Sequence, residues 1–279
     1  MIVVETKRFG ILRERRAFLA EAALAYEMLQ RLAPDEIVKL VATELELAHH
    51  RYLVRREQHS TLLIDLSKGP DHVWGGMNQT CRRWIRRGEK LQGHIQQNTE
   101  SAFQSFLALY NEVASRRDTS EVAPLTSAAA RDFACFSDVF TVYLDGVPLC
   151  SHLTLRDEEA GRTRMLFSAS ARERNRENAT TCAALNRYLY WYQFQIYAHR
   201  GFRSYDLGGI RHANDPITYF KCSFGGEIKK QYHYVFAGSP RIARFLYWIR
   251  GTPFGSRILR SGWSTARLGM QRFGLAARY

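Results

Sequence analysis

Two glycine pairs near residue 210 restrict this chain more than any other feature of its sequence. The first pair ends the stretch YDLGG at 205–209, and the second lies in FKCSFGGE at 220–227, with Lys221 between them. This order predicts a strand, a bend, a helical turn, a second bend and a new strand. Glycine costs conformational entropy, so it marks places where a ligand or another strand comes close to the backbone. Two tight turns at a sheet edge remain the alternative for either pair alone.

Two segments of the chain resemble a known family. The pattern YDLGGI…FKCSFGGE at 205–227 resembles the C-terminal signature of the FemABX-like branch of the GNAT acyltransferase fold. A second segment starts with DLS at 65–67, continues through Trp74 and ends with RRWIRRGEK at 82–90. It is similar to the "DLS…W…R..IRKAEK" segment of that family. Together the two matches span residues 60–237.

The resemblance implies an α+β fold with a mixed sheet, organised as a tandem of two GNAT-like domains. A reduced N-terminal domain is expected at residues 1–117 and a fuller catalytic domain at 125–237. The stretch RDTSEVAP at 117–124 contains turn-forming residues and is the best inter-domain linker. Residues 238–279 are expected to form a basic amphipathic tail.

The spacing of apolar residues predicts the order of helices and strands. Helices are expected at 11–31, 34–49, 71–91, 99–116, 126–134, 179–200 and 215–222. Strands are expected at 52–54, 61–66, 93–97, 140–144, 147–155, 163–169, 204–207 and 227–236. The helix at 179–200 has the clearest signals, because Asn178 is a good N-cap and Gly201 follows its C-terminus.

The positive charge of the chain is concentrated near its C-terminus. The net charge is +13, and residues 228–279 contain ten basic residues and no acidic one. Arginines alternate there with aromatic and aliphatic residues, which is typical of a helix lying on an anionic membrane surface. A helix that packs on the core of the protein itself explains the pattern equally well. No recognised nucleic-acid motif occurs, so nucleic acid is expected as a partner only if tRNA carries the donor.

Several classes of protein are not favoured by the sequence. It has no apolar run long enough to span a bilayer and no basic-then-apolar leader, so we expect a cytoplasmic protein, peripheral at most on the inner face of the cytoplasmic membrane. The five cysteines form no CxxC pair, which favours reduced thiols over zinc or disulfides. The adjacent residues His49 and His50 point to different faces of a helix, so no metal is expected.

The resemblance places the donor, an acyl-CoA, at the N-terminus of the helix at 179–200. Exposed N–H groups and the helix dipole favour phosphate at such a position. The glycine-rich cradle that is usual in the family is absent, and arginines occupy the preceding loop instead. The expected donor-binding residues are Arg172, Arg174, Arg176, Asn178 and Thr180.

Substrate binding is predicted for the basic face of the helix at 71–91, for the glycine pairs and for Lys221. Arginine forks suit phosphates and carboxylates, although a solvated basic face and a surface salt bridge remain alternatives. The predicted substrate-binding residues are Arg83, Arg86, Arg87, Lys90, Gly208, Gly209, Lys221, Gly225 and Gly226. The candidate catalytic bases are His212, Asp206 and Glu227. Asp206 fits a structural role at the bend better than a catalytic one.

The resemblance implies an N-acyltransferase in which an amine attacks the donor carbonyl directly, without a nucleophile triad. The preferred acceptor is a nucleotide- or lipid-linked amino sugar in the synthesis of cell-surface polysaccharide. The first alternative is a Fem-type transferase that uses aminoacyl-tRNA to extend a peptidoglycan precursor. The second alternative is a non-catalytic GNAT-like module of the cell envelope.

Overall fold

The computed structural model describes residues 2–8, 12–47, 52–116, 124–173, 176–211 and 214–250. Their strands are β1 (Ile2–Arg8), β2 (Leu12–Phe18), β3 (Glu36–Thr43), β4 (Leu53–Asp65), β5 (His94–Gln97), β6 (Ser137–Leu144), β7 (Val147–Asp157), β8 (Arg162–Ser170), β9 (Ser204–Ile210) and β10 (Glu227–Ala237). Their helices are α1 (Ala22–Gln30), α2 (Pro70–Gly76), α3 (Gln79–Lys90), α4 (Glu100–Arg116), α5 (Ser127–Arg131), α6 (Arg176–His199), α7 (Pro216–Cys222) and α8 (Pro240–Arg250). Short 3₁₀ turns η1 (Ala134–Phe136) and η2 (Ala171–Glu173) precede β6 and α6.

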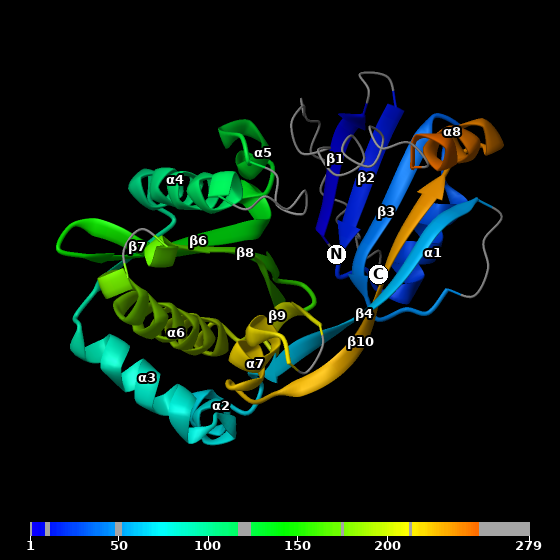
Figure 1. The fold of residues 1–279 in the computed structure, drawn as a ribbon. Coiled ribbons are helices and arrows are strands. Elements are labelled where there is room, and N and C mark those ends of the chain that lie inside the picture. The colour runs from blue at the N-terminus through cyan, green and yellow to red at the C-terminus, as the bar shows by residue number, and fades with distance from the viewer. Residues whose placement is uncertain are drawn as a thin grey trace, which may run out of the picture.

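These strands form one mixed sheet in the order β1-β2-β3-β10-β4-β9-β8-β7-β6-β5. The pairs β2–β3 and β8–β9 are parallel, and the other neighbours are antiparallel. The long strands β4 and β10 run from the N-terminal strands to the strands β5–β9 (Figure 1). The expected α+β fold with a mixed sheet is therefore confirmed.

Helices cover both faces of the sheet around β6–β8. The helices α4 and α5 lie on one face, while α6 lies on the other with α3 outside it (Figure 1). The backbones of α3 and α6 come so close at Gly88 that an added Cβ would lie 2.6 Å from the carbonyl oxygen of Ala184. On the opposite face the N-terminal strands reach the segment after α5, where the rings of Phe18 and Phe133 are 5.8 Å apart.

The two N-terminal helix predictions are wrong in different ways. Residues 11–31 contain the strand β2 followed by the helix α1. The inward side chains of β2 include the buried pair Glu14 and Arg16, so the alternation of apolar and polar residues that marks a strand is missing. The segment predicted as a helix at 34–49 is the strand β3, which lies between β2 and β10 and is apolar on both faces. His49 and His50 lie outside the described residues.

Most later elements agree with their predictions. The predicted strands at 52–54 and 61–66 are parts of one strand, β4. The predicted helix at 71–91 is divided into α2 and α3, because the side chain of Asn78 caps a new helix by accepting from the N–H of Cys81 at 2.7 Å. Residues 117–123 of the predicted linker and residues 251–279 of the predicted tail lie outside the described residues. The division into two GNAT-like domains stays a prediction.

The buried carboxylate of Asp132 gives a prediction about stability. Burial raises its pKa from 3.8 to about 6, against the opposing effect of Arg16, so the charged form is disfavoured in the folded protein. This cost is fully present above pH 6 and disappears below pH 3.8. Asp132→Asn should therefore raise the free energy of unfolding by ~1–2 kcal/mol at pH 8, after discounting for solvent screening, and by nothing near pH 3.5.

Urea denaturation at the two pH values measures this effect. Asp145→Asn, in the exposed turn between β6 and β7, is the matched control and should change little at either pH. A loss of stability in Asp132→Asn at pH 8 would mean that the attraction to Arg16 outweighs the cost of burial.

Candidate active site

The parallel strands β8 and β9 separate in the middle of the sheet. Their ladder joins residues 162–164 of β8 to residues 204–206 of β9. β8 continues to Ser170 and β9 to Ile210, and no further pair joins them within the described residues. Backbone groups on the facing edges are therefore available to hydrogen-bond a ligand that enters between the strands.

A buried polar network lies where these strands separate. The carboxylate of Asp206 accepts from the hydroxyl of Thr61 and from the N–H of Gly208, the latter at 2.7 Å, on one oxygen. Its other oxygen accepts from the guanidinium of Arg164 and from the amide of Gln231, the latter at 2.8 Å. Arg164 also donates to the Gln231 amide oxygen at 2.9 Å. Both oxygens of Asp206 are thus occupied, which favours the structural role over that of a base.

Lys221 places an ammonium group against the first glycine pair. The helix α7 carries it, beginning with Pro216 after the N-cap Asp215, whose side chain accepts from a backbone N–H of the first turn. The Lys221 Nζ atom donates to the carbonyl oxygen of Gly209 at 2.6 Å. Burial lowers the pKa of Lys221 to about 8, so the group is still mostly charged at pH 7.

Two histidines that the sequence analysis did not select lie near the first glycine pair. His59 from β4 and His233 from β10 have ring centroids 4.1 Å apart. An added Cβ at Gly209 would lie 4.0 Å from Cδ2 of His59, so this ring borders the glycine that holds Lys221. Burial lowers the pKa of His59 and that of His233, the latter to about 3. Both rings are therefore neutral at pH 7, and their buried Nε2 atoms have no hydrogen-bond partner within the described residues.

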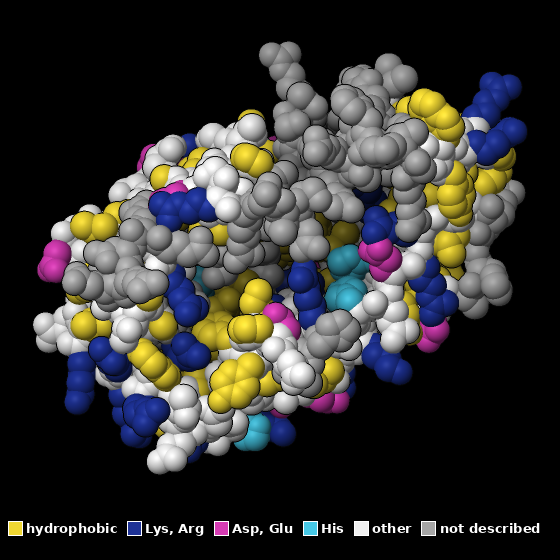
Figure 2. All heavy atoms as spheres, in the orientation of Figure 1, with side chains coloured by type: hydrophobic (Ala, Val, Ile, Leu, Met, Phe, Trp, Pro, Cys, Tyr) yellow, Lys and Arg dark blue, Asp and Glu magenta, His cyan; other side chains and the backbone are white. Residues whose placement is uncertain are grey.

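A hollow opens between the N-terminal strands and the rest of the molecule, near the place where β4, β9 and β10 meet. Figure 2 shows basic, acidic and histidine side chains on its walls, with hydrophobic side chains on the side of α6 and α7. A substrate could therefore reach the separated strands from this side.

Arg187 on α6 is a second cation that the sequence analysis did not select. Its guanidinium lies 4.6 Å from the ring centroid of Phe220 and 5.8 Å from that of Trp84. Its Nε atom is buried without a hydrogen-bond partner, and no ion pair of Arg187 occurs among the described residues. Burial lowers its pKa, and the nearby charge of Arg172 lowers it further. Two neighbouring arginines, one of them partly desolvated, suit a phosphate or another anion.

Comparison with known families identifies the fold around this site. Residues 76–221 match a family model described as an acetyltransferase (GNAT) domain. The chain belongs to the GNAT acetyltransferase family. The match extends from the last residue of α2 to Lys221 and so includes β8, β9, α6 and most of α7. No curated protein sequence matches the chain.

Solved structures of other GNAT-like proteins share the fold. The C-terminal domain of a putative lysylphosphatidylglycerol synthetase from Agrobacterium fabrum has a TM-score of 0.61 at 14% identity, over 96% of this chain and 88% of that chain. FemX has a TM-score of 0.63 at 10% identity, and the match covers 88% of this chain and 85% of FemX. The L-PGS of Bacillus licheniformis has a TM-score of 0.52 at 10% identity, and the match covers 87% of this chain and 85% of that chain. The expected resemblance to the FemABX-like branch is thus confirmed at the level of the fold.

The GNAT fold brings some predicted site residues together and separates others. Asp206, Gly208, Gly209 and Lys221 meet where the two strands separate. Glu227 lies apart, at the start of β10, with an exposed side chain that pairs with Lys229 at 2.5 Å. Its predicted role as a base has no support from this geometry and stays a prediction.

The second glycine pair packs against the protein's own backbone. An added Cβ would lie 2.5 Å from the carbonyl oxygen of Gly76 at position 225, and 2.6 Å from that of Leu63 at position 226. Both residues also have positive φ angles, of 78° and 93°. Close approach of neighbouring backbone and tight turning therefore explain Gly225 and Gly226. Contact of this pair with substrate stays a prediction.

The predicted basic face of α3 is exposed on the outer side of α6 (Figure 1). Arg86 lies over the ring of Trp74 at 5.5 Å, and Arg87 lies over that of Trp84 at 5.4 Å. The face comprises Arg83, Arg86, Arg87 and Lys90. Binding of substrate by these residues stays a prediction.

Only part of the predicted donor site can be located. Arg172, in η2, and Thr180, in the first part of α6, are exposed. Arg174 and His212 lie outside the described residues, as do the side chains of Arg176 and Asn178. Across the described part of the chain, no three histidine, cysteine or acidic side chains gather as a metal site would require. No helix in this part is both long enough and apolar enough to cross a bilayer.

Proposed function

We propose that this protein transfers an acyl group from an acyl-CoA to the amine of a nucleotide- or lipid-linked amino sugar in the synthesis of cell-surface polysaccharide. The observation that carries this proposal is the ammonium of Lys221, which is desolvated and held at Gly209 where β8 and β9 separate. A fixed cation in a partly buried site stabilises negative charge that develops on a carbonyl oxygen.

The proposed reaction is a direct displacement at the thioester carbon. The amine nitrogen forms a bond to this carbon, the carbon–sulfur bond breaks, and CoA leaves as a thiolate. Lys221 donates a hydrogen bond to the carbonyl oxygen as its negative charge grows. The amine loses one proton, which neutral His59 accepts and the thiolate finally takes up.

The donor is proposed to lie between β8 and β9 with its phosphates near Arg172 and Arg187. Support comes from the desolvated guanidinium of Arg187, which lacks an ion-pair partner among the described residues. The acceptor is proposed to enter through the hollow, on the face of β4 and β10 that carries His59 and His233. A cytoplasmic location belongs to the same proposal.

A second candidate function is transfer of an aminoacyl group from aminoacyl-tRNA to a cell-envelope acceptor. The shared fold of FemX and of the lysylphosphatidylglycerol synthetase domain supports it. The exposed arginines of α3 add support, because a row of such residues suits a polyphosphate chain. The chemistry differs only in the bond that breaks, which is the carbon–oxygen bond of an ester.

Calorimetric titration with acetyl-CoA and longer acyl-CoAs tests the proposal. We expect micromolar binding to the wild type and a loss of about tenfold or more in Arg172→Ala/Arg187→Ala, because each arginine makes a charge-assisted contact. Arg31→Ala, an exposed residue directly after α1, is the matched control and should bind like the wild type.

Each outcome of this titration has a defined meaning. Binding that the double variant retains would contradict the location of the donor. Absence of acyl-CoA binding, together with transfer that requires aminoacyl-tRNA, would favour the second candidate. Absence of binding and of transfer with both donors would leave a non-catalytic GNAT-like module.

A further inference from the structure

The helix α8 has one face that is occupied by the core of the protein. Its side chains Ile242 and Leu246 are buried and form a cluster with Ile37 of β3 and Val54 of β4. This contact fixes the rotation of the helix on the sheet. The expectation that the C-terminal helix packs on the protein's own core is therefore confirmed for this face.

The opposite face of α8 combines arginines with exposed aromatic rings. Arg241, Arg244, Phe245 and Trp248 follow one another at the spacing i, i+3, i+4 and i+7, so they form one stripe. Trp248 is 69% exposed and Phe245 40%, and their ring centroids are 6.5 Å apart. Figure 2 shows hydrophobic and basic side chains side by side over this helix.

Exposed hydrophobic residues gather here more than elsewhere on the described surface. Eight large hydrophobic side chains are exposed among the described residues, and α8 carries three of them, at positions 245, 247 and 248. Tryptophan and tyrosine are enriched where proteins meet the interface of a bilayer, because their rings are amphipathic. Such a stripe on one helix face suits the flat surface of a bilayer.

The charge of this region favours an anionic partner. Neither Arg241 nor Arg244 forms an ion pair within the described residues, and no acidic residue occurs from position 228 to the end of the chain. A single-stranded nucleic acid would also be anionic, but bases stack on ring faces that are free. The rings of Phe245 and Trp248 stack on each other instead, with 24° between their planes. These observations favour phospholipid over nucleic acid.

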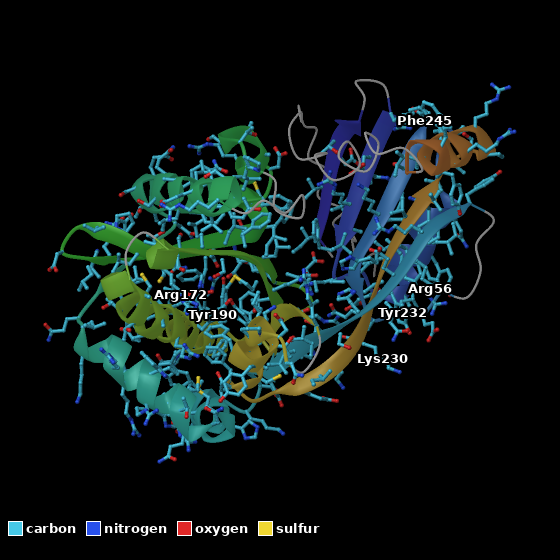
Figure 3. All side chains as sticks on the ribbon, viewed as in Figure 1. Arg56, Arg172, Tyr190, Lys230, Tyr232 and Phe245 are labelled. Atoms are coloured by element: carbon cyan, nitrogen blue, oxygen red, sulfur yellow. The ribbon has the colours of Figure 1, made fainter. Side chains whose placement is uncertain are left out.

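We infer that α8 binds the protein to the surface of an anionic phospholipid bilayer. The rings of Phe245 and Trp248 enter the interface, and Arg241 and Arg244 contact headgroup phosphates. Figure 3 shows Phe245 at the end of the molecule far from Tyr190. The contact therefore leaves the hollow and the separated strands accessible, and the inference does not depend on the proposed acyl transfer.

Vesicle flotation with the full-length protein tests this inference. The wild type should bind vesicles of phosphatidylcholine mixed with phosphatidylglycerol and should bind pure phosphatidylcholine much more weakly. Phe245→Ala/Trp248→Ala should weaken partition by about tenfold or more. Arg241→Gln/Arg244→Gln should weaken it by about fivefold for each arginine and reduce its dependence on salt.

Controls separate this effect from loss of the fold. Tyr26→Ala removes another exposed aromatic ring, on α1, and should bind like the wild type. Trp248→Ala alone should keep the thermal midpoint of the wild type, because this side chain lies mostly in solvent. Equal binding by the double aromatic variant and the wild type would overturn the inference. Binding to single-stranded RNA without binding to anionic vesicles would overturn it as well.

Discussion

Replacing Lys221 by alanine is expected to lower kcat/KM for acyl transfer by about a hundredfold to a thousandfold. The ammonium is fixed at the carbonyl oxygen of Gly209 and is partly desolvated, so it stabilises developing charge more strongly than a solvated lysine would. Steady-state kinetics with the donor that binds, together with thermal unfolding, would measure the effect. Lys68→Ala, an exposed lysine paired with Asp65, is the matched control and should retain full activity.

The pH dependence of the rate distinguishes catalysis by Lys221 from a structural role. The pKa of this ammonium is about 8, so the wild-type rate should fall as the pH rises through 8 and the charge is lost. Lys221→Arg keeps its charge at every accessible pH and should lose this fall, even if its rate is lower. A full rate in Lys221→Ala, or an unchanged alkaline limb in Lys221→Arg, would contradict the proposed role.

Replacing Asp206 by alanine is expected to lower the free energy of unfolding by about 3–5 kcal/mol. The carboxylate is 1% exposed and accepts four hydrogen bonds, and its removal leaves the guanidinium of Arg164 buried without its partner. The N–H of Gly208 also loses its acceptor, so the turn that presents Gly209 to Lys221 should loosen. Urea denaturation at pH 7 measures the loss.

A double-mutant cycle shows whether the ion pair itself causes this loss. Arg164→Met combined with Asp206→Ala removes both buried charges, and the double variant should be more stable than Asp206→Ala alone. If the losses of the two single variants add instead, Arg164 and Asp206 do not stabilise each other. Asp145→Asn, in an exposed turn, provides a reference for loss of a carboxylate outside the network.

The sequence predicted the C-terminal half of the fold better than the N-terminal half. The helix α6 and the strands β6–β9 carry local signals, which are alternation, turn residues and the glycine after the helix, and these lie where the structure has them. The predicted N-cap Asn178 is wrong, because α6 already begins at Arg176. The strands β2 and β3 lack such signals. Burial of Glu14 and Arg16 in β2, and apolar faces on both sides of β3, arise from packing between distant segments.

The candidate site was also predicted only in part, for a similar reason. The glycine pair and Lys221 stand out within one short stretch of sequence, and the structure brings them together. His59 lies in RREQHST, which reads as a polar segment, and His233 alternates with tyrosines. Only the pairing of β4 with β10, which joins residues about 170 positions apart, brings the two rings into contact. No local pattern could have revealed it.

The place of β10 in the sheet has a consequence for the synthesis of this protein. β10 inserts between β3 and β4, so these two strands have no shared neighbour until residue 237 has left the ribosome. Until then each presents an open edge that can pair with another chain. We therefore expect nascent chains that stop before β10 to aggregate or to require a chaperone, even when β5–β9 have already assembled around α6. Among the described strands, the one made last thus fills a place inside the sheet rather than at its edge.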